Sequence, residues 1–460
     1  MAPRPRRGGA RRPPRRPRRA GIAAVKDPGR VLWWDRTPPR RRHRRLTGSL
    51  DVDVAVVGAG FTGLSTAYHL RRLDPGIRVA ILEARTVGYG SSGRNAGFTM
   101  TLFGLSLQVT KLRFGAARAL EAHRYMERAV ETTRGLIEEL GIACDYEHPG
   151  FLRVATSPHH ERRLRAELEL AERLGIDGIE WLDADAIGLD GPRYFGALVE
   201  SRAGLVDPAK LVAGWIEVLD RLGIPIFDET PVSEIRHAGP RRELRTPAGV
   251  VVADAVVLAT NAWSHLLRPT RRLQVPVWTQ AVATEPLGDR LDAIGWRHRR
   301  GIEDARNLVH YYRLTPDDRL LIGGRDIALA YGRNMDRTLD EGIFRGLEAD
   351  AVELFPALEG VRFTHRWGGP VSATLDLAPA IGRAGKGIFY SLGCMGHGVS
   401  LTHLNGATLA ELVTGRSGEL SEVFFVDRRV LPLPPEPLRI GLAASIRAYL
   451  RLEDRLLDPR

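Results

Sequence analysis

Residues 54–57 form an uninterrupted apolar run, which predicts a parallel strand buried on both faces. A glycine-rich turn, Gly58-Ala-Gly60-Phe-Thr-Gly63, follows the run directly, and Gly63, Ala67 and Leu70 then recur at helical spacing. A second apolar run ends at Glu83. The order of strand, turn, helix and strand predicts a βαβ unit that binds a dinucleotide, with a purely structural glycine turn as the alternative.

Each glycine of this turn has a physical role in such a unit. Gly58 allows the tight turn, Gly60 lets the backbone approach a pyrophosphate, and Gly63 lets the helix pack closely on the strand. The amides at the start of the helix face the phosphates. Glu83 can accept hydrogen bonds from ribose hydroxyls.

The remaining apolar periodicity divides the chain into helical and strand-like stretches. Spacing typical of helices covers residues 105–141, 158–174, 206–222, 340–354, 401–413 and 440–457. Strand-like runs cover residues 150–156, 224–227, 230–232 and 250–260. Alternation of apolar and polar residues across 275–324 predicts an antiparallel sheet.

Charge is distributed very unevenly along the 460 residues, which are enough for two interleaved domains. Residues 1–50 contain 17 Lys and Arg against 2 Asp and Glu, whereas residues 51–460 contain 50 against 53. The Arg- and Pro-rich arm, residues 1–47, is therefore expected to be disordered. Such an arm can bind nucleic acid or an anionic membrane surface, but a solvated extension or a start codon placed too far upstream is favoured.

Several classes of protein are excluded by simpler features. Only residues 20–25 follow the arginine pairs before charge returns, which is too short for an export signal. No apolar run approaches the roughly eighteen residues of a transmembrane helix. The two cysteines, Cys144 and Cys394, form no metal-binding spacing and no disulfide framework, so we expect no metal site and a cytoplasmic location.

Three further motifs make the interpretation specific. A small-residue loop, Gly90-Ser-Ser-Gly-Arg-Asn-Ala-Gly97, follows Glu83; residues 367–382 contain W-G-G and D-L-A-P-A-I-G; and Gly396-His-Gly398 precedes the helix at 401–413. Together with the βαβ unit, these motifs resemble the D-amino-acid-oxidase-like (glycine/sarcosine oxidase) flavoenzymes, and most of all their gamma-glutamylputrescine oxidase branch. The resemblance spans residues 50–415.

The resemblance implies an α/β fold in which a Rossmann-like FAD-binding domain is interleaved with an α+β substrate domain containing an antiparallel sheet. After the arm, the expected FAD-binding parts are residues 48–110, 204–270 and 364–416. The expected substrate-domain parts are residues 111–203 and 271–363, and residues 417–460 form a tail with a short helix.

The resemblance also implies the site residues. Those expected to bind FAD are Gly58, Gly60, Phe61, Thr62, Gly63, Glu83, Ala84, Arg85, Ser91, Ser92, Gly93, Arg94, Asn95, Ala96, Gly97, Val232, Thr260, Asn261, Gly396, His397, Gly398 and Val399. Those expected to act on the substrate are Arg94, Arg325, Trp367 and His397. His310 and Tyr312 are further candidates, for which ordinary strand positions are equally plausible.

Departures from the family's motifs narrow the prediction. Gly369 stands where the sarcosine-oxidase branch attaches FAD through a cysteine, and no histidine lies between Gly88 and Phe98, so FAD should be bound non-covalently. Ser400 replaces a lysine that grips the substrate carboxylate. Leu321 stands near the position of the family's oxygen-activating lysine, which leaves open an electron acceptor other than O2.

We therefore expect an FAD-dependent enzyme that oxidises a C–N bond of a small amine or amino acid to an imine by hydride transfer to flavin N5, with O2 as acceptor giving H2O2. A polyamine derivative or another secondary amine is favoured over glycine or sarcosine. Alternatives are a dehydrogenase with another electron acceptor, a flavoprotein tethered to nucleic acid or membrane by its arm, and an NAD-dependent dehydrogenase. No specific nucleic-acid partner is expected.

Overall fold

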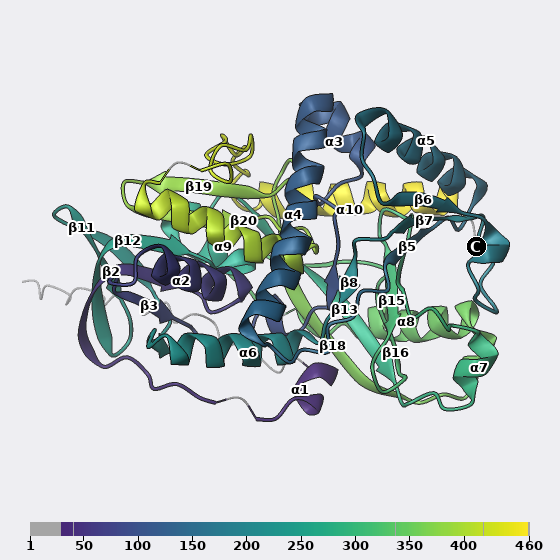
Figure 1. The fold of residues 1–460 in the computed structure, drawn as a ribbon, viewed down its shortest axis with the longest axis horizontal. Coiled ribbons are helices and arrows are strands. Elements are labelled where there is room, and N and C mark those ends of the chain that lie inside the picture. The colour runs from purple at the N-terminus through teal and green to yellow at the C-terminus, as the bar shows by residue number, and fades with distance from the viewer. Residues whose placement is uncertain (1–28, 40, 336, 417, 459–460) are drawn as a thin grey trace, which may run out of the picture.

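Two β-sheets lie beside each other in the computed structural model, which describes residues 29–39, 41–335, 337–416 and 418–458 (Figure 1). The sheet on the left of the view contains the predicted βαβ unit, and the sheet on the right belongs to the second domain. The chain passes between the two sheets several times, as the interleaved arrangement requires. The predicted α/β fold with a mostly parallel sheet and a second, largely antiparallel sheet is confirmed.

The left-hand sheet has a parallel centre. Strands β9, β3, β2, β12 and β20 run parallel in that spatial order, and β19, β11 and β10 extend it by antiparallel pairing. Their bounds are β2 Gly48–Val57, β3 Val79–Leu82, β9 Ile226–Phe227, β10 Glu234–Ala238, β11 Arg241–Arg245, β12 Gly249–Leu258, β19 Ala380–Gly385 and β20 Ile388–Leu392.

Four helices share an apolar core with one face of this sheet. They are α2 (Phe61–Leu73), α4 (Ala116–Leu140), α6 (Pro208–Arg221) and α9 (Gly398–Thr414). Helix α6 begins as predicted, because Pro208 occupies its first turn and the Asp207 carboxylate accepts from the amides of Ala209 and Lys210. Helices α2 and α9 cross closely, since a Cβ on Gly406 would lie 2.3 Å from Ser65 Oγ.

The right-hand sheet follows the order β1, β18, β13, β16, β15, β14, β5, β7, β6, and β17 also pairs with β13. Its bounds are β1 Gly29–Arg30, β5 Phe151–Val154, β6 Ile179–Leu182, β7 Ala197–Glu200, β13 Val275–Thr284, β14 Gly301–Asp304, β15 His310–Leu314, β16 Leu320–Gly324, β17 Ala328–Leu329 and β18 Phe363–Ala373. All pairs are antiparallel except β5 with β14.

The two faces of this sheet have different neighbours. Helix α8 (Glu341–Leu354) packs on the outer face, where it shares a core with Ile322, Tyr312 and Ile302. The short α7 (Arg290–Ile294) contributes to the same cluster. The inner face turns toward the glycine loops of the first sheet; two short strands, β4 (Phe98–Thr99) and β8 (Gly204–Leu205), pair in this region. Helices α3 (Leu107–Phe114) and α5 (Pro158–Leu174) cover its β5–β7 end.

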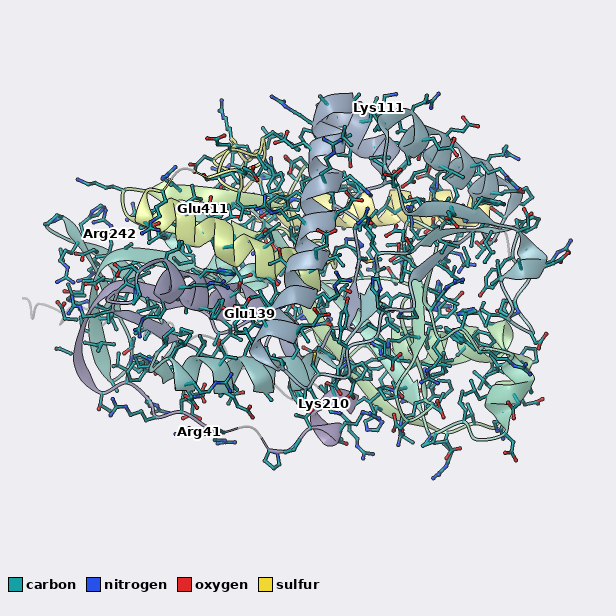
Figure 2. The ribbon with its side chains drawn as sticks, in the orientation of Figure 1. Arg41, Lys111, Glu139, Lys210, Arg242 and Glu411 are labelled. Atoms are coloured by element: carbon teal, nitrogen blue, oxygen red, sulfur yellow. The ribbon has the colours of Figure 1, made fainter. Side chains whose placement is uncertain are left out.

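The predicted disorder of the arm is wrong from Gly29 onward, while residues 1–28 lie outside the described residues. Strand β1 pairs with β18, and helix α1 (Leu32–Arg36) follows it between the two sheets (Figure 1). Trp33 is fully buried against Ala281, Leu321 and Trp367. Farther along, Arg41 lies on the outside of α6 and donates to Asp220 at 2.8 Å (Figure 2). The short apolar run 31–34 makes these buried contacts. The composition of the arm as a whole, which is rich in arginine and proline, gives no indication of them.

Two other boundaries differ from expectation. The sequence predicts that residues from 364 onward belong to the FAD-binding domain, but strand β18 pairs along its length with β13 and belongs to the second sheet. The predicted strand at 230–232 is irregular chain, although the amide of Thr230 donates to the carbonyl of Glu83 at 2.7 Å. Strand β18 joins the sheet of its partner β13, and residues 230–232 have no partner strand among the described residues; local periodicity reveals neither arrangement.

The C-terminal helix α10 (Leu438–Leu457) has 20 residues and docks on the second sheet. Its Asp454 accepts from the amides of Asn307 and Leu308, and Arg447 pairs with the buried Asp326. The expected helix of the C-terminal tail is therefore present and packs on the second sheet, but it is not short. Among the described residues, no helix has the length and apolar character needed to cross a bilayer.

The burial of Val31, Leu32 and Trp33 predicts different outcomes for two N-terminal truncations. Removing residues 1–28 leaves this cluster intact, whereas removing residues 1–37 exposes its partners. We expect the longer truncation to melt at a clearly lower temperature, since loss of a buried Trp alone costs about 3–5 kcal/mol. Trp33→Ala in the full chain should reproduce most of the loss, and Tyr331→Ala, at a side chain that is 61% exposed, should not. Equal melting of the two truncations would contradict the docking.

Candidate active site

The predicted cofactor residues meet at one edge of the parallel sheet. Strand β2 ends at the glycine turn, β3 ends before Glu83, β12 ends before Thr260, and β20 ends before the loop 393–397. Because the carboxyl ends of parallel strands share an edge, ligands of such sheets bind there. Residues separated by more than 300 positions are thereby brought to one place.

The glycine turn leaves no room for side chains. Gly58 has φ +104°, and a Cβ on it would lie 2.6 Å from the carbonyl oxygen of Ala259. A Cβ on Gly63 would lie 2.0 Å from the carbonyl oxygen of Gly58, so α2 can begin directly against the turn only because that residue is glycine. Thr62, predicted beside them, is 9% exposed in the first turn of α2.

Glu83 fastens this turn to the chain that follows β3. Its carboxylate accepts from the amide of Ala59 at 2.8 Å and from the amide of Arg85 at 2.8 Å. Burial raises the pKa of Glu83 above its ordinary value, although these hydrogen bonds act in the opposite direction. The carboxylate therefore holds Ala84 and Arg85 beside the turn, at the position predicted for ribose recognition.

The loop 91–97 is held by its own polar residues. The Asn95 side chain donates to the carbonyls of Ser91 and Ser92 and accepts from the amide of Gly97 at 2.7 Å. Ser92 Oγ accepts from the amide of Phe61 at 2.9 Å, which connects the loop to the start of α2. Ser91 Oγ donates to the carbonyl of Pro370 in β18. The sequence G-S-S-G-R-N-A-G thus specifies one bonded loop between the two domains.

Arg94 and Trp367 brace the same loop. Arg94 is 4% exposed, donates to the carbonyl of Gly368 at 3.0 Å and lies over the Tyr89 ring. Trp367 is 1% exposed and donates from Nε1 to the carbonyl of Arg94 at 2.9 Å. The structure therefore places Trp367 in the core behind the loop, where it positions Arg94 and presents no surface to a substrate.

The second glycine loop approaches from β20. Met395 has φ +51° and Gly396 has φ +96°, and α9 begins at Gly398 without a side-chain cap. Among the described residues, His397 Nδ1 is a buried atom with no hydrogen-bond partner. Burial, and then the charge of Arg153, lower the pKa of His397 to about 4, so its ring is neutral at physiological pH. Ser400 is fully buried and donates to the carbonyl of Met100 at 3.1 Å.

The remaining predicted cofactor residues lie near the ends of β9 and β12. Val232 is 5% exposed in a cluster with Leu82 and Leu258. Asn261 has φ +38°, and its side chain accepts from Cys394 Sγ at 3.6 Å. Thr260 Oγ1 lies 2.9 Å from Ser264 Oγ. These contacts join the end of β12 to the loop that precedes α9.

A row of side chains crosses the inner face of the second sheet opposite these loops. Strand register aligns Arg153 of β5 with Glu303 of β14, Glu303 with Tyr311 of β15, and Tyr311 with Gly323 of β16. The Tyr311 ring is half-buried over Gly323, whose Cβ would lie 2.4 Å from the phenol oxygen. Facing residues on adjacent strands lie within contact distance of each other. Arg153, Glu303 and Tyr311 therefore form one wall.

The electrostatics of this wall are dominated by burial. The Arg153 guanidinium pairs with Glu167 of α5 at 2.7 Å, and Glu200 accepts from the Thr101 hydroxyl at 2.7 Å. Burial raises the pKa of Glu303 to about 7 and the pKa of Tyr311 to about 12. Sequence reasoning missed Arg153, Glu303 and Tyr311. The available signal was Arg153, a charged residue within the short, otherwise apolar strand β5, because a charge is costly to bury without a partner.

Three predicted substrate residues lie on the other face or outside the sheet. Arg325 is exposed and pairs with Asp350 of α8 at 2.9 Å. Tyr312 is buried against α8, and its hydroxyl is hydrogen-bonded to that of Tyr194. His310 contacts Asp304 at 3.1 Å and Asp350 at 2.8 Å. Alternation along β15 turns residues 310 and 312 outward and Tyr311 inward, which favours the ordinary strand positions for His310 and Tyr312. Arg325 lies on the side of α8, away from the inner face.

Comparison with known proteins identifies the family. The pattern of the DAO family, described as FAD dependent oxidoreductase, matches residues 53–412. The chain belongs to this family of FAD-dependent oxidoreductases. The gamma-glutamylputrescine oxidoreductase of Escherichia coli K12 is 35% identical over 416 residues, which cover 89% of this chain and 95% of that protein. The sarcosine oxidase subunit beta of Rhodobacter capsulatus is 26% identical and covers 86% and 90%, respectively.

Solved structures agree on the fold. The glycine oxidase from Geobacillus kaustophilus superposes with a TM-score of 0.71 at 23% identity, covering 83% of this chain and 100% of that one. The L-proline dehydrogenase from P. horikoshii gives a TM-score of 0.68 at 21% identity, with 81% and 96% covered. The resemblance and the FAD cofactor inferred from the motifs are confirmed, and the NAD-dependent alternative is set aside.

The residues at the sheet edge fit FAD. The turn at Gly58–Gly63 forms a cradle that any Cβ would fill, Glu83 stands at the end of the next strand, and the orphaned His397 Nδ1 lies in the second glycine loop. The uncapped start of α9 adds the positive end of a helix dipole. These are the donor and acceptor groups that a dinucleotide requires.

Gly63→Ala tests the cradle. The added Cβ meets backbone 2.0 Å away, and overpacking of this kind costs about 1–3 kcal/mol, so we expect the variant to purify with little flavin. Gly135→Ala is the matched control, because Gly135 also lies in a helix and a Cβ there would contact nothing. The measurement is visible flavin absorbance per protein. Full flavin content in Gly63→Ala would contradict the assignment of the turn.

The His310 cluster predicts a pH-dependent stability. Burial alone would lower the pKa of His310, but hydrogen bonds to Asp304 and Asp350 outweigh it and raise that pKa. The pKa of Asp304 is lowered, mainly by His310, against the opposing effect of burial. A raised His pKa stabilises the fold below about pH 6.5 and loses its effect as pH rises, whereas the lowered Asp pKa loses its effect toward acid.

We therefore expect His310→Gln to destabilise the protein by about 1.5–3 kcal/mol between roughly pH 4 and 6.5, and by less at higher pH. Denaturant unfolding across this range measures the difference. His237→Gln, at an exposed position in β10, should unfold like the unchanged protein at every pH. A His310→Gln penalty that grows with rising pH would show that the ion pair is absent.

Proposed function

We propose that this protein oxidises a C–N bond of a small amine or amino acid to an imine, which water then hydrolyses to a carbonyl compound. The observation that carries the proposal is the half-buried Tyr311, with Glu303 beside it, on the inner face opposite the glycine loops. The names of the relatives from E. coli and R. capsulatus refer to amine and N-methyl amino-acid chemistry and support the same class.

The wall opposite the loops has the character of a substrate site. Tyr311, Thr279 and Val371 of the inner face are partly accessible, in contrast to the buried residues around them. The Tyr311 hydroxyl is hydrogen-bonded to Thr279, which fixes the ring over Gly323. A small molecule in this space contacts an aromatic ring, apolar side chains and a few polar groups, as is typical of ligand pockets.

When bound, FAD supplies the acceptor for the two electrons that leave the substrate. The chain's own residues set the environment of that transfer. The start of α9 and the amides of the loop 396–398 favour negative charge at the edge they face. The neutral ring of His397 can donate or accept there without adding a charge. Arg94, which is held by Gly368 and Trp367, lies on the side of the site formed by the loop 91–97.

Gly369 supports non-covalent binding of FAD. This residue lies in β18 beside Arg94, and a Cβ on it would be 3.9 Å from Arg94 Nε, so the position is next to the loop 91–97 and offers no nucleophile. The stretch from Gly88 to Phe98 also contains no histidine. Denaturation should therefore release all flavin from the protein into the supernatant.

For the electron acceptor we propose O2. Leu321 is fully buried in an apolar cluster with Ala281 and Trp33, so the inner face carries no cation at this position. This observation favours a second candidate, a dehydrogenase that passes electrons to another acceptor.

Anaerobic addition of an amine panel to the purified holoprotein tests the reaction class. We expect one or more amines to bleach the flavin bands, because two electrons reach the flavin before any acceptor is present. Air should then restore the bands with formation of peroxide, and a bleached flavin that is stable in air would identify the dehydrogenase instead. The flavin-poor Gly63→Ala protein is the control for chemistry in free solution. A holoprotein bleached by dithionite but by no amine or amino acid would refute the proposal.

A further inference from the structure

Glu303 is a buried carboxyl for which the fold provides no partner. Its side chain is 8% exposed, yet no hydrogen bond or ion pair joins it to any side chain or amide of the described residues. Its neighbour Asp304, which points to the outer face, is by contrast bonded to His310 and Arg306. The charge of Arg153 offsets the burial of this carboxyl only in part, and no bonded partner completes the compensation, so the carboxyl is available to a ligand.

The other acids of the cluster are already satisfied. Glu167 pairs with Arg153 and accepts from the amide of Leu107, and Glu200 accepts from Thr101. They line a cavity of about 20 Å³ behind Arg153, which has room for roughly one water molecule. Glu303 stands on the other side of Arg153, next to Tyr311 and the accessible part of the inner face. It is therefore the carboxyl that a substrate can reach.

The arginine side chains near this wall are bonded to other groups of the protein. Arg153 is neutralised by Glu167, Arg313 donates to the carbonyls of Ala96 and Val206, and Arg94 donates to the carbonyl of Gly368. The position that could hold a carboxylate-binding lysine carries Ser400, which is buried on the carbonyl of Met100. Arg313 and Arg94 keep their positive charge, but their guanidinium donors are directed at backbone carbonyls. The charged side chain that the wall presents next to the accessible part of the inner face is the Glu303 carboxyl, which is complementary to a cation rather than to a carboxylate.

We propose that Glu303 binds the ammonium group of the substrate and accepts its proton, so that the site takes amines with no carboxylate beside the reacting nitrogen. This inference rests on the proposed oxidation of a C–N bond and names its substrate class. In the proton step, an N–H bond of the ammonium breaks and an O–H bond forms on Glu303. The products are a neutral amine, whose lone pair is free, and an uncharged carboxyl.

The residues around Glu303 allow it to accept this proton. Arg153 and the acids Glu167, Glu200 and Asp304 act on it electrostatically. Tyr311 is the other titratable group of the wall, and the neutral His397 lies in the second glycine loop. Burial places the pKa of Glu303 at about 7, so the carboxylate is substantially present at physiological pH and is a competent proton acceptor. Protonation by the substrate also removes the buried charge.

With a cation that cannot be oxidised, binding to the site can be measured without turnover. tert-Butylammonium has no hydrogen on the carbon attached to nitrogen, so it cannot form an imine, and pivalate is the anion of the same shape. We expect the holoprotein to bind tert-butylammonium and not pivalate, measured by the change in the flavin spectrum and by calorimetry. Glu303→Gln should weaken this binding at least about tenfold. Glu353→Gln, which removes an exposed charge on α8, should leave it unchanged.

Kinetics test the proton step with whichever amine reduces the flavin. For the unchanged enzyme, kcat/KM should rise through the pKa of Glu303 and then level off. In Glu303→Gln it should be about 10²–10⁴-fold lower near neutral pH and rise with pH toward the pKa of the free amine, because only the neutral amine then reacts. A purely structural role would lower flavin content or stability without changing the shape of the profile.

The panel pairs each amine with the amino acid that adds one carboxylate, such as butylamine with 2-aminopentanoate. Preference for the amino acid, or unchanged tert-butylammonium binding in Glu303→Gln, would overturn the inference. Loss of that binding in a protein whose flavin no amine reduces would uphold the cation site and refute the proposed oxidation instead.

Discussion

The buried guanidinium of Arg313 joins the two halves of the molecule. It extends from the inner face of β15, is 1% exposed, and donates to the carbonyls of Ala96 and Val206 while lying over the Trp33 ring at 5.5 Å. Burial lowers its pKa to about 10, which still leaves it charged, so its donors must find acceptors. Those acceptors are backbone atoms of the first domain, and the second sheet is thereby fixed in distance and rotation against the loop 91–97.

The positions of the residues on the inner face depend on this contact between the two domains. Tyr311 is two residues from Arg313 on the same strand and points the same way, and the register of β14 and β5 then places Glu303 and Arg153 beside it. The loop opposite is equally constrained, because Asn95, Trp33 and Trp367 fill its hydrogen bonds from three directions. A rigid wall facing a rigid loop holds reacting groups in place, which is what catalysis by positioning requires.

Much of the first domain could be predicted because its rules are local. The close contact of Gly63 with the carbonyl of Gly58 lies within six residues, and α6 runs from Pro208 to Arg221 as its N-terminal proline indicates. The carboxyl ends of β2, β3, β12 and β20 then share an edge by the geometry of parallel sheets alone. The substrate wall could not be predicted in this way. Strand β15 is buried on both faces, so its alternation gives no sign of which residues turn inward.

The sequence by itself determined the dinucleotide turn and the loop G-S-S-G-R-N-A-G, because Gly63 meets Gly58 and Asn95 bonds Ser91, Ser92 and Gly97 within a few residues. The FAD-dependent class followed from the order of the motifs along the chain. Tertiary structure alone decided that Trp33, in an arm rich in arginine, completes the core, because its partner Asn95 lies 62 positions away. It also decided that Glu303 rather than Asp304 faces the site. The two acids are adjacent in sequence, and only the strand's place between two different layers assigns one a salt bridge and leaves the other for a ligand.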